Sequence, residues 1–418
     1  MRKLRLPAVL LAAVLCLSGC GKQTPPSTGQ ISVPDSSSQQ QTEPPRRTAP
    51  VYGTGFRNDP ADRLTTAEAV RDMGHGITLG FTFEGSAKQP ANSSVPDFET
   101  GWGSPRITQK MIRGYADAGF GVLRIPVAWM NLIQSDGTVH PELLDRVHRV
   151  TGWALNAGMY VILDMHPGSE WLSAFADPEK NAAGMQQYIR IWQQICSEFA
   201  GEGAHLLFAS LDPDSCREIF RDNPAPENTS GMLLALSQAF VDTVRSSGGG
   251  NPRRHLLIAG YPGDQTGFFD PQFQMPEDPV SRCAVSVRYR APEAFSLLEA
   301  DGERIAARAE WGTAQDRTDM QADFGLLAGQ FTTADVPVVI GECGCALQNK
   351  DPDSVRMYLA ALCEEAAACG FCPVLWDMPG GLYDRQRCRL YDPLLQTMLL
   401  APSAVQTTPA VPYARGNK

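Results

Sequence analysis

The most constraining feature of this sequence is a rhythm: after Tyr52, short apolar runs alternate with amphipathic stretches of helical length. Apolar runs of this length predict buried strands, and a helical stretch after each one predicts βα units around a parallel sheet. We expect eight strands, at residues 76–81, 121–126, 160–165, 205–211, 255–260, 284–289, 336–341 and 371–376. Eight such units predict an α/β fold, a closed (β/α)8 barrel.

The segments between the strands carry helix signals. We expect helices at residues 108–118, 141–157, 184–200, 231–247, 319–330 and 353–368. Gly119, Gly158 and Gly370 stand where helices should stop, because glycine accepts the left-handed conformation that turns the chain back toward the next strand. In such barrels the chemistry lies at the carboxyl ends of the strands, so candidate site residues are sought there.

The amino-terminal segment predicts export. A basic start is followed by an apolar run from Leu6 to Leu17, which is the layout of a secretory signal. The ending Leu17-Ser18-Gly19-Cys20 resembles the lipobox of bacterial lipoproteins, in which the cysteine is lipidated after cleavage. We therefore expect a lipoprotein signal at residues 1–20, lipid on Cys20, and a membrane-anchored position outside the cytoplasm. An uncleaved anchor is the alternative, and it leaves the protein on the same side of the membrane.

Composition divides the rest of the chain. Residues 21–55 are rich in Gln, Ser, Thr and Pro, and they predict a disordered linker. We assign residues 56–400 to the barrel and residues 401–418 to a disordered tail.

Charge and cysteine content restrict the possible partners. The chain has 46 acidic and 36 basic residues, a formal net charge of -10, which argues against a nucleic-acid partner. Of eleven cysteines, Cys16 would leave with the signal and Cys20 would carry lipid, so an odd number, nine, is left and at least one thiol is unpaired. No cysteine pair has a second pair at zinc-finger distance, so we expect neither a metal nor a cofactor.

Polar and aromatic side chains gather at the predicted strand ends. The second strand carries Arg124, the third ends at Asp164-Met165-His166, the seventh at Glu342, and the eighth at Trp376-Asp377. A buried arginine needs carboxylate partners, so Arg124 is either an orienter of a catalytic carboxylate or a salt bridge serving only the barrel. The strand ends predict one shared site at the barrel mouth.

Several longer stretches together resemble glycoside hydrolase family 5, the cellulase family. They are Glu99-Thr100-Gly101-Trp102-Gly103, the run from Arg124 to Trp129, the run from Trp153 to Leu163, the run from Phe240 to Gly249, the run from Arg254 to Tyr261, and the run from Pro337 to Glu342. The resemblance extends from about residue 73 to residue 393. It implies a TIM barrel that cleaves β-linked glucans or related polysaccharides with retention, using two glutamates about 5 Å apart.

The resemblance also implies roles for individual residues. Glu342 matches the nucleophile, Arg124 its supporting arginine, and His166 the first of a pair of histidines. Tyr289 matches a tyrosine near the nucleophile and Trp376 a sugar-stacking platform. Trp171 is a further tryptophan that we expect to line the cleft.

The sequence departs from the family at the other catalytic position. Where the fourth strand of the family ends in Phe-Glu-Ser-Leu-Asn-Glu, this chain has Phe208-Ala209-Ser210-Leu211-Asp212-Pro213, and proline cannot transfer a proton. Losing general acid help typically lowers the rate by about a hundred- to ten-thousand-fold. Asp212 or Asp214 is a possible substitute acid, the alternative being that both are ordinary solvated loop residues.

Other positions change in the same direction. The second histidine of the third strand is Pro167, and the histidine expected on the sixth strand is Arg288. On the first strand Ile77, Thr78 and Phe81 replace Trp, Asn and Asn. Arg288 is expected either to hold Glu342 as an anion or to pair with an acidic sugar.

These observations lead to three hypotheses. The first is an exported lipoprotein whose barrel binds a β-glucan-type polysaccharide or oligosaccharide with lost or much reduced hydrolase activity. The second is an active retaining, endoglucanase-like glycosidase with Glu342 as nucleophile and Asp212 or Asp214 as acid. The third is a barrel that serves only as an envelope scaffold.

Overall fold

The computed structural model describes residues 51–85, 94–223, 228–260 and 272–400. The predicted signal, Cys20, the linker up to residue 50 and the tail from residue 401 lie outside the described residues. Within the described ranges, no helix is long and apolar enough to cross a membrane.

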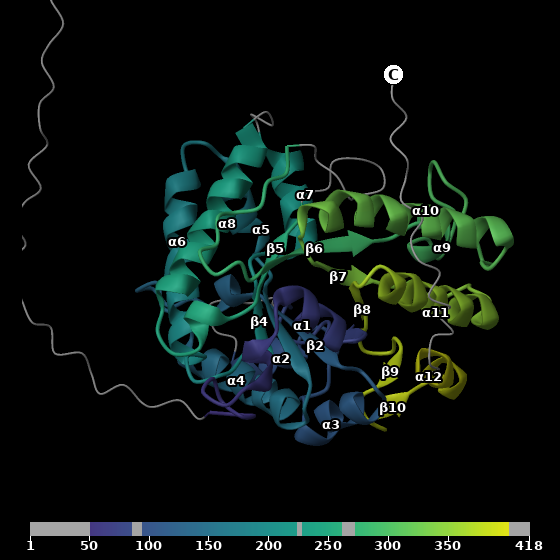
Figure 1. Cartoon of the computed structure of the whole chain (residues 1–418), viewed down its shortest axis with the longest axis horizontal. Coiled ribbons are helices and arrows are strands. Elements are labelled where there is room, and N and C mark those ends of the chain that lie inside the picture. The colour runs from purple at the N-terminus through teal and green to yellow at the C-terminus, as the bar shows by residue number, and fades with distance from the viewer. Residues whose placement is uncertain (1–50, 86–93, 224–227, 261–271, 401–418) are drawn as a thin grey trace, which may run out of the picture. The chain divides into compact units, whose positions relative to one another are not determined.

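Eight parallel strands close into a barrel, as the rhythm of apolar runs predicted (Figure 1). Neighbours along the chain are neighbours in the sheet, and β1 pairs with β8 to close it. The strands are β1 (Gly76–Thr78), β2 (Val122–Val127), β3 (Tyr160–Met165), β4 (Leu206–Ala209), β5 (Leu256–Ala259), β6 (Cys283–Tyr289), β7 (Val338–Cys343) and β8 (Cys372–Leu375). The (β/α)8 prediction is confirmed, although β1 is shorter than the predicted 76–81.

Helices surround the barrel. They are α1 (Thr66–Asp72), α2 (Val95–Thr100), α3 (Gln109–Asp117), α4 (Pro141–Asn156), α5 (Ser169–Ala176), α6 (Asn181–Glu198), α7 (Pro213–Asp222), α8 (Thr229–Ser246), α9 (Glu293–Ser296), α10 (Ala314–Phe331), α11 (Pro352–Ala368) and α12 (Pro393–Leu400). A short hairpin of β9 (Tyr383–Asp384) and β10 (Arg389–Leu390) follows β8.

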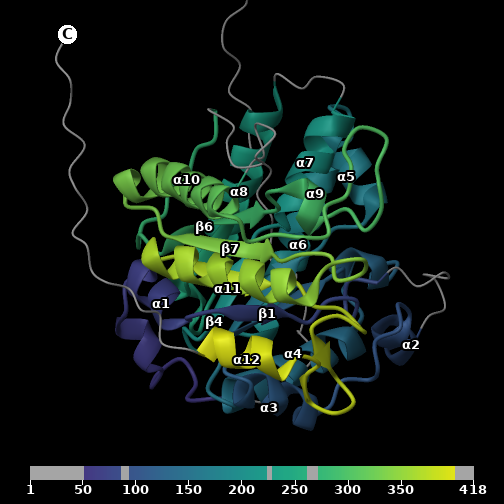
Figure 2. The ribbon, with the colours of Figure 1, turned by 90° about the vertical axis from the view of Figure 1, so that its right-hand side faces the viewer.

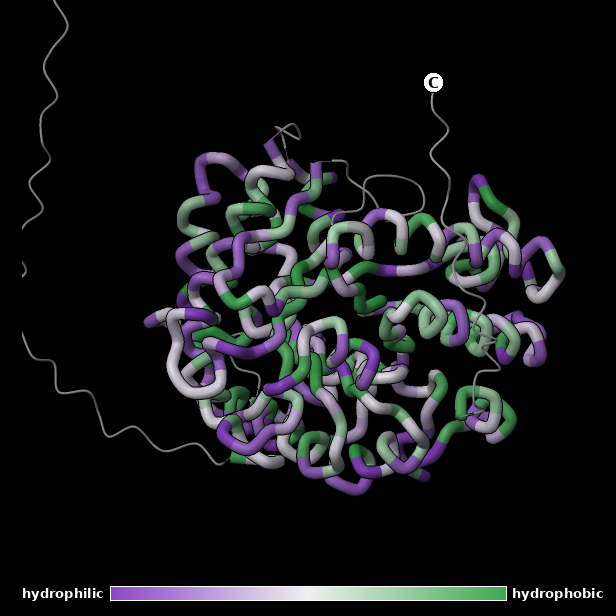
Figure 3. Tube along the Cα trace, viewed as in Figure 1, coloured by the Kyte–Doolittle hydropathy of each residue, from purple (hydrophilic) through white to green (hydrophobic). Residues whose placement is uncertain are grey.

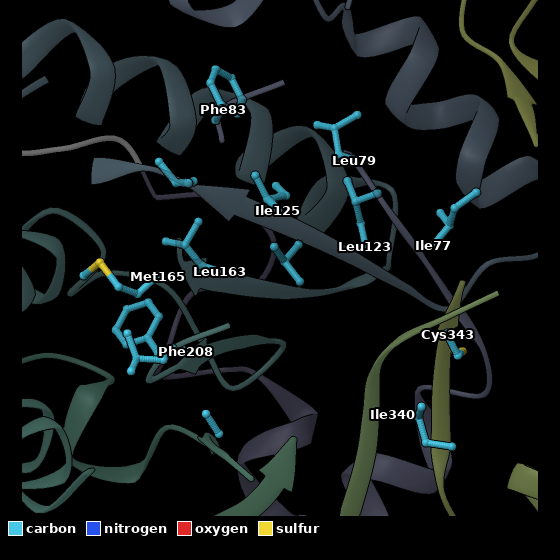
Figure 4. Close-up of a cluster of buried hydrophobic side chains, with 14 of the residues drawn as sticks. Ile77, Leu79, Phe83, Leu123, Ile125, Leu163, Met165, Phe208, Ile340 and Cys343 are labelled. Atoms are coloured by element: carbon cyan, nitrogen blue, oxygen red, sulfur yellow. The ribbon is translucent and has the colours of Figure 1, made fainter. Parts of the chain in front are cut away.

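Alternate residues of each strand enter two different cores, because side chains of a strand point to opposite faces. The inner core fills the barrel, and its strand members include Val122, Ile162, Leu207 and Val339. The outer core lies between the strands and the helices, and Figure 4 shows part of it. Hydrophobic residues are concentrated in the strands and hydrophilic residues on the outer turns (Figure 3).

The two ends of the barrel are different. Ala69, Val70 and Met73, from α1 and the residue that follows it, pack into the inner core and close the amino-terminal end of the strands. The opposite end is surrounded by loops that carry α2, α5, α7 and α9, each of which follows a strand. Figure 2 shows α1 on one side of the barrel and α2, α5 and α7 on the other. We call this second end the mouth.

The folded region begins slightly before the predicted boundary at residue 56. The backbone N–H of Tyr52 donates to both carboxylate oxygens of Glu202, at 3.1 and 3.2 Å. The Tyr52 ring meets the His148 ring edge to face, with centroids 5.2 Å apart. The end of the predicted linker is therefore packed against the barrel.

Candidate active site

A pocket of about 280 Å³ opens at the mouth. Strands β3, β6 and β7, the first turns of α7 and the loops after β1 and β8 supply its walls. Its lining residues are Glu84, Trp102, His166, Pro167, Asp212, Asp214, Ser215, Glu218, Arg288, Arg290, Glu342 and Trp376. The structure thus brings together Glu342, Asp212, Asp214, His166, Arg288 and Trp376, with Arg124 directly behind them.

A β-bulge aims Glu342 into this pocket. The pairing of β6 with β7 shifts after Val287, so that Arg288 lies opposite Glu342 and Gly341 is the extra residue. A bulge of this kind reverses the alternation of side chains and redirects the next one. Gly341 fits because a Cβ there would lie only 2.3 Å from the Ser286 hydroxyl oxygen. Glu342 is buried, with 5% of the residue exposed.

Arg124 is the hub of a buried ion cluster. Its Nε donates to Asp164 Oδ2 at 2.8 Å, its Nη2 to Asp212 Oδ2 at 2.5 Å, and its Nη1 to Glu342 Oε2 at 3.2 Å. Burial disfavours the charged guanidinium, but these carboxylates outweigh burial and raise its pKa. Arg124 therefore positions three acids at once rather than a single nucleophile.

Two more arginines bind the other oxygen of Glu342. Arg288 Nη2 and Arg290 Nη2 both donate to Glu342 Oε1. Burial alone would raise the pKa of Glu342, but the charges of Arg288 and Arg290, with a contribution from Arg124, lower it below its ordinary value. Both oxygens of the carboxylate are thus occupied by guanidinium groups, which stabilise the anion.

The two possible substitute acids are each paired with an arginine. Asp212 is the N-cap of α7 and accepts from the Asp214 N–H at 2.8 Å, while its other oxygen binds Arg124. Burial raises the pKa of Asp212, but Arg124 and other nearby positive charges lower it below the ordinary value. Asp214 is paired with Arg288. The alternative that both are ordinary solvated loop residues does not hold for Asp212, which is buried.

Pro213 occupies the first position of α7, between these two aspartates. Proline is favoured there because the first helical N–H has no partner within the helix and the fixed φ suits the helix start. The residue at the expected acid/base position is therefore buried and part of a helix start.

Aromatic rings form one side of the pocket. Phe81 meets the Trp102 ring edge to face at 5.1 Å between centroids and the Trp376 ring at 6.0 Å. Phe81 has a φ of 56°, a left-handed conformation that is uncommon for a residue with a bulky side chain. Its N–H donates to the carboxylate of Glu84, which holds the turn.

Glu84 is the pocket carboxyl best able to carry a proton at neutral pH. It is 5% exposed, and burial raises its pKa to about 7. The positive charge of Arg124 lowers this pKa and the charge of Glu342 raises it, but burial is the larger effect. A protonated Glu84 can donate a hydrogen bond into the pocket.

Two predicted site residues lie elsewhere. Trp171 is 5% exposed; its ring stacks on Phe175 at 4.9 Å, and its Nε1 donates to the Gly184 carbonyl at 3.0 Å, so it packs α5 against α6. Tyr289 faces the outer core, where its hydroxyl donates to Asp323 at 3.1 Å. Strand alternation explains this correction, because Arg288 and Arg290 face the pocket and the residue between them cannot.

The sequence reading missed three residues of the site: Arg290, Glu84 and Trp102. Arg290 comes two residues after Arg288, so the alternation of side chains along a strand could have predicted that both point to the same face. Glu84 and Trp102 lie on the long connection after β1, whose path sequence periodicity does not determine. No group of three or more His, Cys, Asp or Glu side chains in the described ranges is arranged to hold a metal ion.

Comparisons with known proteins agree with this architecture. The profile of the family described as cellulase (glycosyl hydrolase family 5) matches residues 85–380. Endoglucanase A of Paenibacillus barcinonensis is 33% identical over 79% of this chain and 87% of its own length. Endoglucanase B of Ruminococcus albus is 29% identical, with 81% of each chain covered.

Solved structures give the same result. A broad specificity endoglucanase from an uncultured bovine rumen ciliate superposes with a TM-score of 0.70 and 30% identity, covering 81% of this chain and 97% of that one. A glycoside hydrolase family 5 lichenase from Caldicellulosiruptor, solved in complex with cellotetraose, superposes with a TM-score of 0.70 at 27% identity, covering 80% and 94% of the two chains.

Proposed function

We propose, given that the chain belongs to glycosyl hydrolase family 5, that its barrel binds a β-glucan-type polysaccharide without hydrolysing it at a significant rate. The observation that carries this proposal is the state of the two catalytic positions. One is Pro213, and the other, Glu342, has both carboxylate oxygens bound by arginine.

The acid half of the reaction lacks a proton donor at the expected position, where Pro213 stands. A retaining mechanism needs a carboxylic acid that protonates the leaving oxygen and later activates water. Asp212 holds the start of α7 and Arg124, and Asp214 is paired with Arg288, so either one would have to break an ion pair before it could carry a proton. An active glycosidase that uses Asp212 or Asp214 is therefore the less favoured function.

The nucleophilic half is weakened as well. A carboxylate that accepts from three guanidinium groups is a stabilised anion, and attack on a sugar carbon would require it to give up part of that stabilisation. Arg288 and Arg290 thus fit a pocket that has kept its shape while the carboxylate at the nucleophile position has become less reactive.

The same ion pairs favour a neutral ligand. Arg124, Arg288 and Arg290 each face at least one carboxylate, so an acidic sugar would have to displace Glu342 or Asp214. The pocket also offers Trp102 and Trp376, and sugars stack on aromatic faces of this kind. Endoglucanases are among the relatives of this chain, and the lichenase superposes with cellotetraose bound, so β-glucan is the polysaccharide class that we propose.

We also propose that the protein is a lipoprotein outside the cytoplasm, anchored through Cys20. The support is the sequence alone, with its basic start, apolar run and lipobox-like ending. The full chain should incorporate labelled fatty acid in bacterial cells, and Cys20→Ser should not. Equal labelling of both would contradict the proposal.

Calorimetry against cello-oligosaccharides tests the function, with the recovered sugars checked for cleavage. We expect binding with intact sugars, and loss of binding in Trp376→Ala. Trp153→Ala is a matched control, because Trp153 lies near the end of α4 that precedes β3, at the closed end of the barrel. Cleavage that Glu342→Gln abolishes would establish the active enzyme instead, and the absence of any binding would favour the scaffold.

A further inference from the structure

A buried histidine near the closed end of the barrel binds two carboxylates. His148, on α4, has 3% of its side chain exposed. Its Nδ1 lies 2.7 Å from Glu198 Oε1, and its Nε2 lies 2.8 Å from Glu202 Oε1. An ionised carboxylate only accepts hydrogen bonds, so both ring nitrogens must carry a proton for the two contacts to be hydrogen bonds. The geometry is that of an imidazolium held between two anions.

The second of these glutamates also holds the point where the chain enters the barrel. Glu202 lies in the loop between α6 and β4, and its side chain is 0% exposed. The Tyr52 N–H donates to both of its carboxylate oxygens, at 3.1 and 3.2 Å, and the Tyr52 ring packs edge to face on the His148 ring. We call residues 51–56 the clasp, because this segment covers the buried Glu202 carboxylate.

The other charged groups around the clasp do not replace the imidazolium. Asp145 and Arg149, also on α4, act on the clasp with opposite charges. Arg254 lies beneath Glu202, but it donates to the main-chain carbonyl of this residue, at 3.0 Å, and not to the carboxylate. The printed side-chain partner of the Glu202 carboxylate in the described part of the chain is therefore His148.

The two glutamates keep His148 protonated. Burial lowers the pKa of His148, but the hydrogen bonds and charges of Glu198 and Glu202 outweigh burial and raise the pKa above its ordinary value of 6.5. Loss of the proton sets one ring nitrogen lone pair against a carboxylate. Glu198 is 20% exposed and can turn to water, whereas Glu202 cannot while the clasp covers it. A buried carboxylate with less positive charge beside it is costly, and opening the clasp relieves that cost by admitting water.

We propose that His148 is a proton-controlled switch for the clasp: the protonated ring holds residues 51–56 against the closed end of the barrel, and loss of the proton releases them. The clasp is closed below pH 6.5 and loosens as the pH rises through the higher pKa of His148 in the folded protein. Release lengthens the connection before the barrel by up to about 20 Å, at about 3.3 Å per extended residue. The switch lies at the end opposite the pocket, so it does not depend on sugar binding.

Amide hydrogen exchange of the full-length protein from pH 6 to pH 9 tests the switch, with each rate corrected for the intrinsic exchange rate of that amide at the same pH. Protection of the Tyr52 amide should fall about three- to tenfold over this range, since a charge-supported hydrogen bond is replaced by a weaker one. Ile107 is the matched internal control. Its N–H also donates to a buried glutamate, Glu99, at 2.7 Å, but that carboxylate is held by Arg146, which does not titrate. Protection of the Ile107 amide should not change.

Two variants separate the proton from the contact. Glu202→Gln keeps an acceptor for the Tyr52 N–H but removes the buried charge, so protection of Tyr52 should no longer depend on pH. His148→Gln should also remove the pH dependence, with the clasp in its looser state throughout. Constant protection of Tyr52 in the wild type, or a pH dependence that survives in both variants, would overturn the switch.

The wild type alone provides a further test if either variant fails to fold. The NMR titration of the His148 ring should have the same midpoint as the loss of Tyr52 protection, because one proton controls both. Two clearly different midpoints would overturn the switch.

Discussion

The charges around Glu342 are the residue-scale difference between this mouth and a working retaining site. Three arginines hold one carboxylate, and the carboxyl that is able to hold a proton near neutral pH is Glu84, on a different loop. The sequence placed Arg124 and Glu342 on predicted strands at the mouth, and the resemblance to the family pointed to Arg288 and to the role of Glu342. Glu84 was not identified, because its buried position depends on the turn at Phe81.

Glu84 should make the fold less stable as pH rises. Its pKa in the folded protein, about 7, exceeds its ordinary value of 4.5, so the folded state holds the proton more tightly than the unfolded state. The contribution of this group to the free energy of unfolding is complete below about pH 4.5 and is lost as the pH rises to about 7. The loss is roughly 3 kcal/mol at most. Gln resembles the protonated acid, so Glu84→Gln should match the wild type at pH 5 and exceed it at pH 8.

Urea unfolding at the two pH values measures this difference. An equal stability difference between Glu84→Gln and wild type at pH 5 and pH 8 would contradict the assignment of a raised pKa to this carboxyl.

Elements were predicted unequally well. The eight strands follow from apolar runs, which burial on both faces requires of a parallel barrel. Helix α7 was missed, because a segment that starts with Asp212-Pro213-Asp214 reads as a turn until its capping bond is seen. The bulge in β7 was also invisible in the sequence, although it decides that Glu342 faces inward. Residues 261–271, which follow β5, lie outside the described residues.

The bulge gives a prediction about β6 and β7. Gly341→Ala places a methyl group 2.3 Å from the Ser286 hydroxyl position, so we expect a loss of about 1–3 kcal/mol in the free energy of unfolding. Adding Ser286→Ala removes the hydroxyl and should recover most of that loss.

Gly231→Ala is the control for replacing a glycine. It lies in α8, where an added Cβ meets nothing within 4 Å, so this change should be neutral or stabilising by up to about 1 kcal/mol. If urea unfolding shows Gly341→Ala to be as harmless as Gly231→Ala, the bulge does not constrain the site as described.

At the scale of the whole molecule, the closed end and the open end of the barrel have different roles. Residues 51–55 attach to the closed end through Tyr52, Glu202 and Asn156, whereas the pocket lies at the opposite end. The fold and the family were predictable because many weak signals repeat along the chain. The docking of Tyr52 was not, because a single aromatic residue beside a polar segment carries no periodic signal.

Tyr52 should therefore contribute to stability. Its ring packs directly on α4, where a Cβ at Gly152 would lie 2.3 Å from the ring. Tyr52→Ala should lower the free energy of unfolding by about 1–3 kcal/mol, since it removes a partly buried aromatic ring. Val51→Ala, at a residue that is 58% exposed, should change it by less than about 0.5 kcal/mol. Equal urea midpoints for Tyr52→Ala and wild type would show that this segment is not docked.

The most direct test of the central claim is the rate of hydrolysis of an aryl β-cellobioside with a good leaving group, measured from pH 4 to pH 8. Such a substrate needs little acid help in the first step, so the release of the aryl group in the first turnover, before the water step, bypasses Pro213 and tests Glu342 alone. We expect wild type and Glu342→Gln to be equally close to the uncatalysed rate at every pH. Turnover by the wild type that Glu342→Gln abolishes would contradict the account, because it would mean that three arginines leave the nucleophile free to react.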